Sequence, residues 1–284
     1  MEYKELVKDV RIPVIGQGTA TERRGRRIMD KSRDKAEVAA YKTGIDFGLT
    51  HIDTAERYSV GYNEELVGEA IKYYDRKDVF VTTKVWSTNL MYEDLIASMK
   101  GSLHRLGLDY VDLYLVHKPN PEVPLKETMS AMEYCAKEGY TRFIGVSNFS
   151  VSMMEEAQSH LKDHRLVANQ VHYSLMEQTP AEQLLPNCQE KDVMLIAYMP
   201  LEIGKLAKPG YTVLDELAQK YGKTNAQVSL NWLISQKKVV AIPKAWNLDH
   251  LKENIGAVGW RLSDEDHKRL SESFRKLSSL PSFH

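Results

Sequence analysis

Short apolar runs recur along the chain at intervals of about one strand–helix unit, and this spacing constrains the fold more than any other feature. The runs are rich in Val, Ile and Leu and nearly continuous in apolar character, which is typical of strands buried on both faces of a parallel sheet. The predicted strands are residues 15–19, 50–52, 79–85, 111–116, 143–146, 167–171, 193–197 and 239–242. Because amphipathic stretches separate them, the strands predict an α/β fold of the (β/α)8 TIM barrel type rather than two open sheets.

The stretches between the strands carry helical periodicity. In residues 91–106, Met91, Leu95 and Met99 lie on one helical face. The predicted helices are residues 34–47, 63–74, 91–106, 125–137, 150–160 and 181–191. Residues 4–14 predict a short N-terminal hairpin that closes the barrel bottom, and residues 262–277 predict an extra C-terminal helix. No linker or low-complexity stretch interrupts the pattern, so residues 1–284 are expected to form a single domain.

Composition excludes several other classes of protein. A formal net charge of −1 gives no overall field that favours nucleic acid or anionic lipid. No apolar run approaches the roughly 20 residues needed to cross a bilayer, and residues 1–10 lack the apolar core of a signal peptide. Cys135 and Cys188 form neither a disulfide framework nor a metal-ligand cluster. We expect a cytoplasmic protein, a monomer or small homo-oligomer, with no metal site and no nucleic-acid or membrane partner.

Polar side chains follow the predicted strands. Asp53, Lys84, His117 and Ser147 are separated by 31, 33 and 30 residues, about one strand–helix unit each. The full set at the strand ends is Asp53, Lys84, His117, Ser147, Asn148, Gln170, Tyr198 and Lys244. The C-terminal strand ends of a barrel converge on one site, so these residues become neighbours. The sequence therefore predicts an active site at the barrel mouth.

Four of the residues near the mouth suit the reduction of a carbonyl group, which needs a hydride donor and an acid for the forming alkoxide. Tyr58 is the candidate proton donor, and a nearby cation is needed to lower its pKa from about 10. Lys84 supplies that cation, and Asp53 holds Lys84 charged and oriented. His117 is predicted to hydrogen-bond the substrate oxygen.

Longer motifs around these residues resemble a known family. Residues 48–68, GLTHIDTAERYSVGYNEELVG, resemble the first signature of the aldo-keto reductases. VTTKVW around Lys84 and VDLYLVHKP around His117 are similar to the family's lysine and histidine motifs, and FIGVSNF around Ser147 is similar to its second signature. The resemblance covers nearly the whole chain and fills all four catalytic positions. It implies NAD(P)H-dependent reduction of aldehydes or ketones, sugar-derived or acidic carbonyls among them, to alcohols.

The resemblance also implies a nicotinamide cofactor across the barrel mouth. Ser147, Asn148 and Gln170 match positions that bind its carboxamide, and a primary amide pairs well with another amide. Tyr198 matches the aromatic residue that stacks on the nicotinamide ring. The glycines of residues 16–18 lack the third glycine of a dinucleotide-binding fingerprint and are interpreted as the tight first turn of the barrel.

Residues 242–254 match the stretch that grips the adenosine 2′-phosphate in the resembled family. The matching residues are Lys244, Asn247, His250, Glu253 and Asn254, the last two at the usual adenine contacts. Ala245 replaces a serine and His250 an arginine, and histidine is charged only below about pH 6.5. NADP(H) is favoured, and use of NAD(H) stays open. A surface helix N-terminus bearing unremarkable polar residues is the alternative interpretation.

On the substrate side, Trp86 matches the family's apolar pocket wall. Ala20 lies where many relatives carry a bulky aromatic residue, which predicts a wider pocket. The basic run Arg23, Arg24, Arg26 and Arg27 either draws acidic or phosphorylated aldehydes or is simply a solvated charged loop.

Two other functions are compatible with parts of this pattern. One is a cofactor-binding barrel that acts as a redox-sensing or regulatory subunit with slow chemistry. The other is a lyase or isomerase with Lys84 as a Schiff base, which leaves Asn148, Gln170 and Tyr198 without a role.

Overall fold

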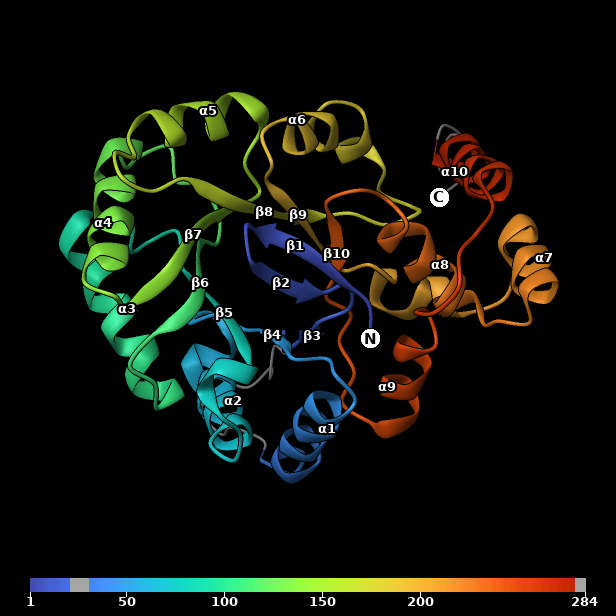
Figure 1. Cartoon of the computed structure of the whole chain (residues 1–284), viewed down its shortest axis with the longest axis horizontal. Coiled ribbons are helices and arrows are strands. Elements are labelled where there is room, and N and C mark those ends of the chain that lie inside the picture. The colour runs from blue at the N-terminus through green and yellow to red at the C-terminus, as the bar shows by residue number, and fades with distance from the viewer. Residues whose placement is uncertain (21–30, 279–284) are drawn as a thin grey trace.

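The computed structural model describes residues 1–20 and 31–278. Eight strands pair in parallel, each with its neighbour in the chain. They are β3 (Gln17–Gly18), β4 (His51–Asp53), β5 (Phe80–Val85), β6 (Val111–Val116), β7 (Thr141–Ser147), β8 (Leu166–His172), β9 (Met194–Tyr198) and β10 (Val239–Ala241). Parallel bridges from Ile15 to Ala241 and from Gly18 to Lys244 join the last strand to the first. The predicted (β/α)8 barrel is confirmed (Figure 1).

The first barrel strand corrects one prediction. Residues 16–18 do not form a tight turn, since Gln17 and Gly18 pair with β4 in strand β3. Glycine is needed there for a different reason. A Cβ on Gly18 would lie 2.6 Å from the carbonyl oxygen of Ile242, so the close approach of the two chain segments depends on the missing side chain.

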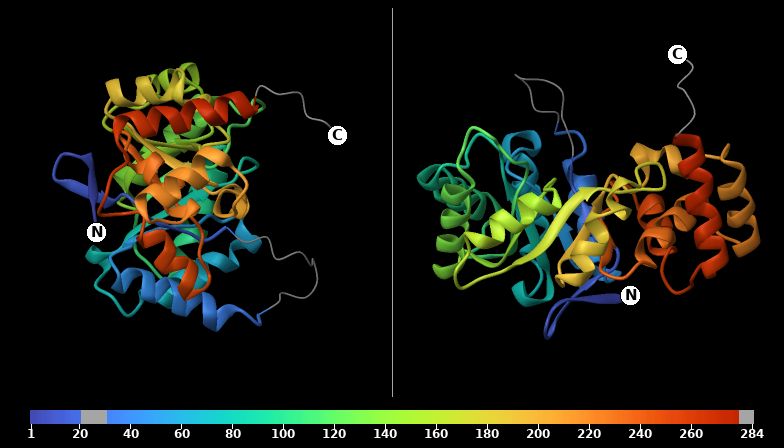
Figure 2. Two further views of the ribbon diagram at one scale, coloured as in Figure 1. Left: turned by 90° about the vertical axis from the view of Figure 1, so that its right-hand side faces the viewer. Right: turned by 90° about the horizontal axis from the view of Figure 1, so that it is seen from above.

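The N-terminal hairpin of β1 (Tyr3–Val7) and β2 (Val10–Pro13) closes the end of the barrel where the strands begin, as predicted (Figures 1 and 2). Leu6 and Ile12 are fully buried and pack with Leu113 and Ile196 of the barrel interior. Burying each such side chain stabilises the fold by roughly 1.5–3 kcal/mol relative to leaving it exposed.

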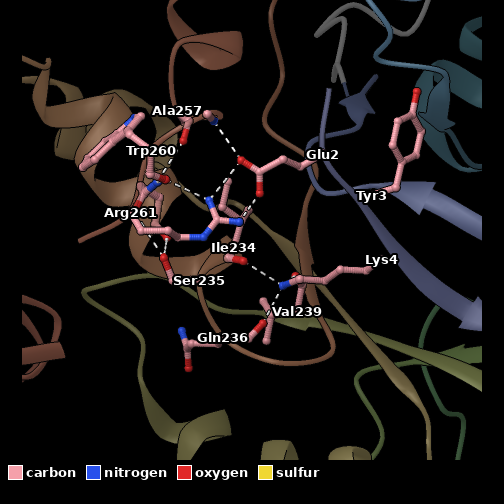
Figure 3. A network of polar contacts seen from close by, with 12 residues as sticks. Glu2, Tyr3, Lys4, Ile234, Ser235, Gln236, Val239, Ala257, Trp260 and Arg261 are labelled. Atoms are coloured by element: carbon pink, nitrogen blue, oxygen red, sulfur yellow. Dashed lines mark hydrogen bonds and ion pairs between the residues drawn. The ribbon is translucent and has the colours of Figure 1, made fainter. Parts of the chain in front are cut away.

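Polar contacts fasten the hairpin to the barrel (Figure 3). Lys4 Nζ donates to the carbonyl oxygens of Ile234 at 2.7 Å, Gln236 at 2.5 Å and Val239 at 2.6 Å. Nearby, Glu2 pairs with the guanidinium of Arg261. The three donors of an ammonium group thus match three carbonyl groups between the end of α8 and the start of β10.

Helices surround the strands (Figure 1). They are α1 (Asp34–Asp46), α2 (Tyr62–Ile71), α3 (Tyr92–Leu106), α4 (Leu125–Lys137), α5 (Val151–Ser159), α6 (Leu184–Glu190), α7 (Thr212–Tyr221), α8 (Asn225–Ile234), α9 (Leu248–Ile255) and α10 (Asp264–Ser278). Short 3-10 helices are η1 (Tyr58–Gly61), η2 (Arg76–Asp78), η3 (Thr179–Ala181) and η4 (Glu202–Ala207). The extra C-terminal helix is confirmed as α10. The helix predicted over residues 181–191 is shorter in the structure. It is α6, which begins only at Leu184, after the separate turn η3.

None of the helices in residues 1–20 and 31–278 has the length and apolar character of a membrane span. The same residues contain no group of three or more His, Cys, Asp or Glu side chains that could hold a metal ion. Cys135 on α4 and Cys188 on α6 are buried free thiols, and burial raises the pKa of each to about 12. Both are therefore protonated and poorly nucleophilic at neutral pH.

Candidate active site

A cleft of about 680 Å³ opens where the barrel strands end. It collects most of the residues that the sequence singled out. Those that line it are Ala20, Asp53, Tyr58, Trp86, His117, Ser147, Asn148, Gln170, Tyr198, Lys244, His250, Glu253 and Asn254. Two predicted residues do not line it: Lys84 is fully buried, and Asn247 caps α9.

Lys84 is held by three oxygen atoms. Its Nζ donates to Asp53 Oδ1 at 2.5 Å, to the carbonyl oxygen of Thr54 at 2.7 Å and to the Tyr58 hydroxyl at 3.4 Å. Burial acts to lower the pKa of Lys84, but Asp53 and Tyr58 outweigh it, so the pKa lies above its ordinary value. A charged, fully buried amine that is already hydrogen-bonded is poorly placed to form a Schiff base, which argues against the lyase interpretation.

The phenol of Tyr58 behaves differently from the sequence prediction. Burial raises its pKa above the ordinary value; Lys84 pulls the pKa down and Asp53 pushes it up. Lys84 therefore opposes the rise without reversing it. At neutral pH Tyr58 carries its proton, and the phenolate that it leaves on proton loss would form 3.4 Å from an ammonium group.

His117 lies between Tyr58 and Trp86, with ring centroids 5.5 Å and 5.1 Å from theirs in edge-to-face geometry. Burial, Lys84 and Arg57 lower the pKa of His117 to about 3. The imidazole is therefore neutral at physiological pH and can donate a hydrogen bond from one ring nitrogen.

Amide groups cover the adjoining wall. Gln170 Nε2 donates to Asp53 Oδ2 at 2.7 Å, so both oxygens of this carboxylate have partners. Asn148 has a left-handed backbone, with φ of 62°. Its Nδ2 donates to the carbonyl oxygen of His117 and to Ser147 Oγ, while its Oδ1 accepts a 2.9 Å hydrogen bond from the Tyr198 hydroxyl. Tyr198 is thereby tied to the end of β7.

At the far end of the cleft, the lining residues Lys244, Trp246 and His250 surround the start of α9. Asn247 is the N-cap of this helix, and its Oδ1 accepts from the His250 backbone N–H at 2.8 Å. This stretch begins a helix and also lines the cleft. A helix N-terminus beside a lysine favours an anion.

Sequence reasoning missed the segment that follows Tyr198. Residues 199–207 line the cleft through Met199, Pro200, Leu201, Ile203, Gly204 and Ala207. Their position just beyond β9 is the signal that could have found them, because the loops after barrel strands form the mouth. Lys118, directly after His117, was missed as well. The basic run Arg23, Arg24, Arg26 and Arg27 lies outside the described residues.

Comparison with known proteins agrees with this geometry. The model of the aldo/keto reductase family matches residues 14–274. The methylglyoxal reductase YeaE of Escherichia coli (strain K12) is 36% identical, over 94% of this chain and 92% of its own length. The thermostable aldo-keto reductase Tm1743, solved with the inhibitor epalrestat, is 45% identical with a TM-score of 0.91, covering 96% of this chain and 100% of that one. An aldo/keto reductase from Klebsiella pneumoniae, solved with NADP and acetate, is 35% identical with a TM-score of 0.83, covering 96% and 94%.

Proposed function

Because this chain belongs to the aldo/keto reductase family, we propose that it reduces aldehydes or ketones to alcohols with NAD(P)H at the cleft described above. The observation that carries the proposal is the buried Lys84 ammonium, held by Asp53 and in contact with the Tyr58 hydroxyl at the floor of that cleft. We also propose that residues 1–284 form one domain, since the first and last barrel strands close against each other.

The residues that line the cleft suit a nicotinamide cofactor. Ser147, Asn148, Gln170 and Tyr198 offer amide, hydroxyl and aromatic groups at one end. Lys244, Asn247, His250, Glu253 and Asn254 gather at or near the other end, where an anionic group would meet a lysine and a helix N-terminus. When bound, the cofactor supplies the hydride. NADP(H) is the preferred form, in keeping with the NADP held by the Klebsiella relative, and NAD(H) is a second candidate because His250 is not a fixed cation.

The chain's own residues orient the carbonyl group and supply the proton. Tyr58 and neutral His117 donate hydrogen bonds to the carbonyl oxygen, which orients the carbonyl carbon for the incoming hydride. Tyr58 then gives its proton to the same oxygen. The phenolate that results is stabilised by Lys84, and Asp53 keeps Lys84 in place. One hydride and one proton convert the carbonyl into an alcohol.

Small or acidic carbonyl compounds are the proposed substrates, with Trp86 and Ala20 lining the pocket. Arg57 supports an acidic substituent, because its guanidinium carbon lies 5.3 Å from the Trp86 ring centroid and its charge affects the pKa of His117. Relatives named methylglyoxal reductases support a small carbonyl substrate.

Loss of absorbance at 340 nm tests the proposal directly. The chain should oxidise NADPH in the presence of methylglyoxal, glyoxylate or a sugar aldehyde, and Tyr58→Phe should lose about 10²-fold or more of this rate while binding the cofactor normally. Equal rates for the two proteins would contradict the role of Tyr58. Tight cofactor binding with turnover far below about 1 s⁻¹ on every carbonyl would favour the redox-sensing alternative.

A further inference from the structure

The segment after β9 is held in a strained backbone conformation. Met199, Glu202 and Ile203 have φ values of 50°, 50° and 54°, in the left-handed region that L-residues with side chains rarely adopt. Such a backbone conformation is unfavourable and persists only where the surrounding contacts fix it. The same segment lines the cleft between Tyr198 and the start of α9.

Glu202 connects this segment to the end of β8 and the loop that follows it. Its Oε1 lies 2.6 Å from His172 Nε2 and accepts a 2.6 Å hydrogen bond from Ser174 Oγ. Only 12% of the Glu202 side chain is exposed. Ser174 is fully buried, and its own oxygen accepts from the backbone N–H groups of Met176 and Glu177, so its hydroxyl proton is free for Glu202.

His172 extends this contact to the cleft wall. Its ring stacks on Tyr198 with centroids 5.6 Å apart and an interplanar angle of 15°. The hydroxyl of Tyr198 is in turn bonded to Asn148. A single imidazole therefore connects Glu202, within the strained segment, to the aromatic ring proposed to lie against the nicotinamide.

We propose that Glu202 is a positioning residue that holds residues 199–207 over the bound cofactor and, through His172, keeps the Tyr198 ring in place. This inference rests on the proposed function. Glu202 itself does not line the cleft, so its effect is on how tightly the cofactor is retained and not on hydride or proton transfer.

Four variants of the chain separate this role from a general effect on stability. Glu202→Ala removes both hydrogen bonds, whereas Glu202→Gln keeps an oxygen that accepts from Ser174. His172→Phe keeps a ring over Tyr198 and loses the bond to Glu202. The matched control is His164→Gln, which alters another His–Glu pair, the 2.8 Å contact of His164 with Glu133 near the start of β8 and away from the cleft.

The readouts are the NADPH dissociation constant and dissociation rate, the single-turnover rate at saturating cofactor, and Tm. Glu202→Ala and His172→Phe should each raise the dissociation constant about tenfold, mainly through faster release, with single-turnover rates within about twofold of wild type. The NADPH dissociation constant of Glu202→Gln should lie between those of these two variants and that of the wild type. His164→Gln should lower Tm about as much as Glu202→Ala does and leave the NADPH dissociation constant unchanged.

An unchanged dissociation constant in His172→Phe, or an equal rise in His164→Gln, would overturn the inference even if Glu202→Ala failed to fold. A wild-type chain that bound neither NADPH nor NADH would overturn the proposed function and this inference with it. If the wild type binds NADPH and the Glu202 and His172 variants have the same dissociation constant, this inference is overturned and the proposed function is not.

Discussion

Lys84 and Asp53 meet because of the register between two neighbouring strands. Parallel pairing of β4 with β5 places Asp53 opposite Thr82, so Lys84 lies two residues further along on the same face of the sheet. Its Nζ reaches Asp53 Oδ1 at 2.5 Å, and the two side chains are 0% and 2% exposed. Since both groups are almost completely shielded from water, each charge depends on the other, and removing one alone leaves a buried charge without compensation.

Replacing this pair should therefore affect stability and activity in different ways. Lys84→Met is expected to abolish reduction and to lower the free energy of unfolding by about 3–5 kcal/mol, because Asp53 keeps a buried charge with no ammonium beside it. Adding Asp53→Asn should recover much of the stability and none of the activity. Urea unfolding and the 340 nm assay measure the two effects. A double variant no more stable than Lys84→Met would show that the unpaired charge is not the cause.

His117 should stay neutral throughout the working pH range, because burial, Lys84 and Arg57 lower its pKa to about 3. The rate of reduction should show no ionisation of this imidazole between about pH 5 and 8. The unfolded chain binds the same proton near pH 6.5, so acidification from about 6.5 towards 3 favours unfolding. The Tm of the wild type should fall over that window more steeply than that of His117→Gln. An NMR titration that places the imidazole pKa above about 5 would contradict this.

The fold was predictable because its signals are local. Strand β6 and helix α4 have the bounds that their apolar patterns predict, since each pattern is unbroken from end to end. Helix α8 was not predicted for the opposite reason. Nine of its residues, Trp232 among them, are buried, so it has no polar face to reveal helical periodicity. Helix α7, between β9 and α8, was not among the predicted elements either.

The site was only partly predictable, because some of its properties depend on burial and on contacts between distant loops. Asp53, Lys84 and His117 follow from their regular spacing. The upward shift in the pKa of Tyr58 does not, since burial outweighs the nearby cation only once the barrel is closed. The contact between Glu202 and His172 joins the segment after β9 to the end of β8, and left-handed φ values at residues other than glycine leave no clear mark in a sequence.

Lys4 should matter for stability and not for chemistry. Lys4→Met keeps the aliphatic stem but leaves the carbonyl groups of Ile234, Gln236 and Val239 without this donor, at an expected cost of about 1–3 kcal/mol. The reduction rate should not change, because the hairpin lies at the opposite end of the barrel from the cleft. The control is Lys8→Met, an exposed lysine in the hairpin turn. Identical Tm values for the two variants would contradict the role given to Lys4.

A permanent positive charge at the start of α9 should raise the affinity of the cleft for NADPH. His250→Arg is expected to tighten NADPH over NADH by about 1–3 kcal/mol, as a charge-assisted hydrogen bond to the 2′-phosphate would. Dissociation constants for both cofactors, in the wild type and in His250→Arg, measure this. A preference that the arginine does not alter would show that residue 250 makes no contact with the phosphate.

Arg57 should select for substrates that carry a negative charge. It directly precedes Tyr58, is exposed, and lies against the ring of Trp86, which lines the cleft beside His117. A carboxylate close to the reacting carbonyl would therefore come near a guanidinium. Arg57→Ser is expected to lower kcat/KM for glyoxylate by about 10–100-fold, as the loss of a charge-assisted hydrogen bond predicts, and to change kcat/KM for propanal by less than about twofold.

Added salt and a second variant identify which cations are responsible for the preference for glyoxylate. Part of the advantage of glyoxylate over propanal comes from long-range attraction and should shrink as added salt screens it, whereas direct contact with Arg57 should persist. Tm should not move in Arg57→Ser, because this side chain is exposed. A companion variant with Arg23, Arg24, Arg26 and Arg27 changed to Ser tests the basic run. If glyoxylate reduction falls only in that companion and Arg57→Ser behaves like the wild type, recognition of the acid belongs to residues 23–27, and the assignment to Arg57 is wrong.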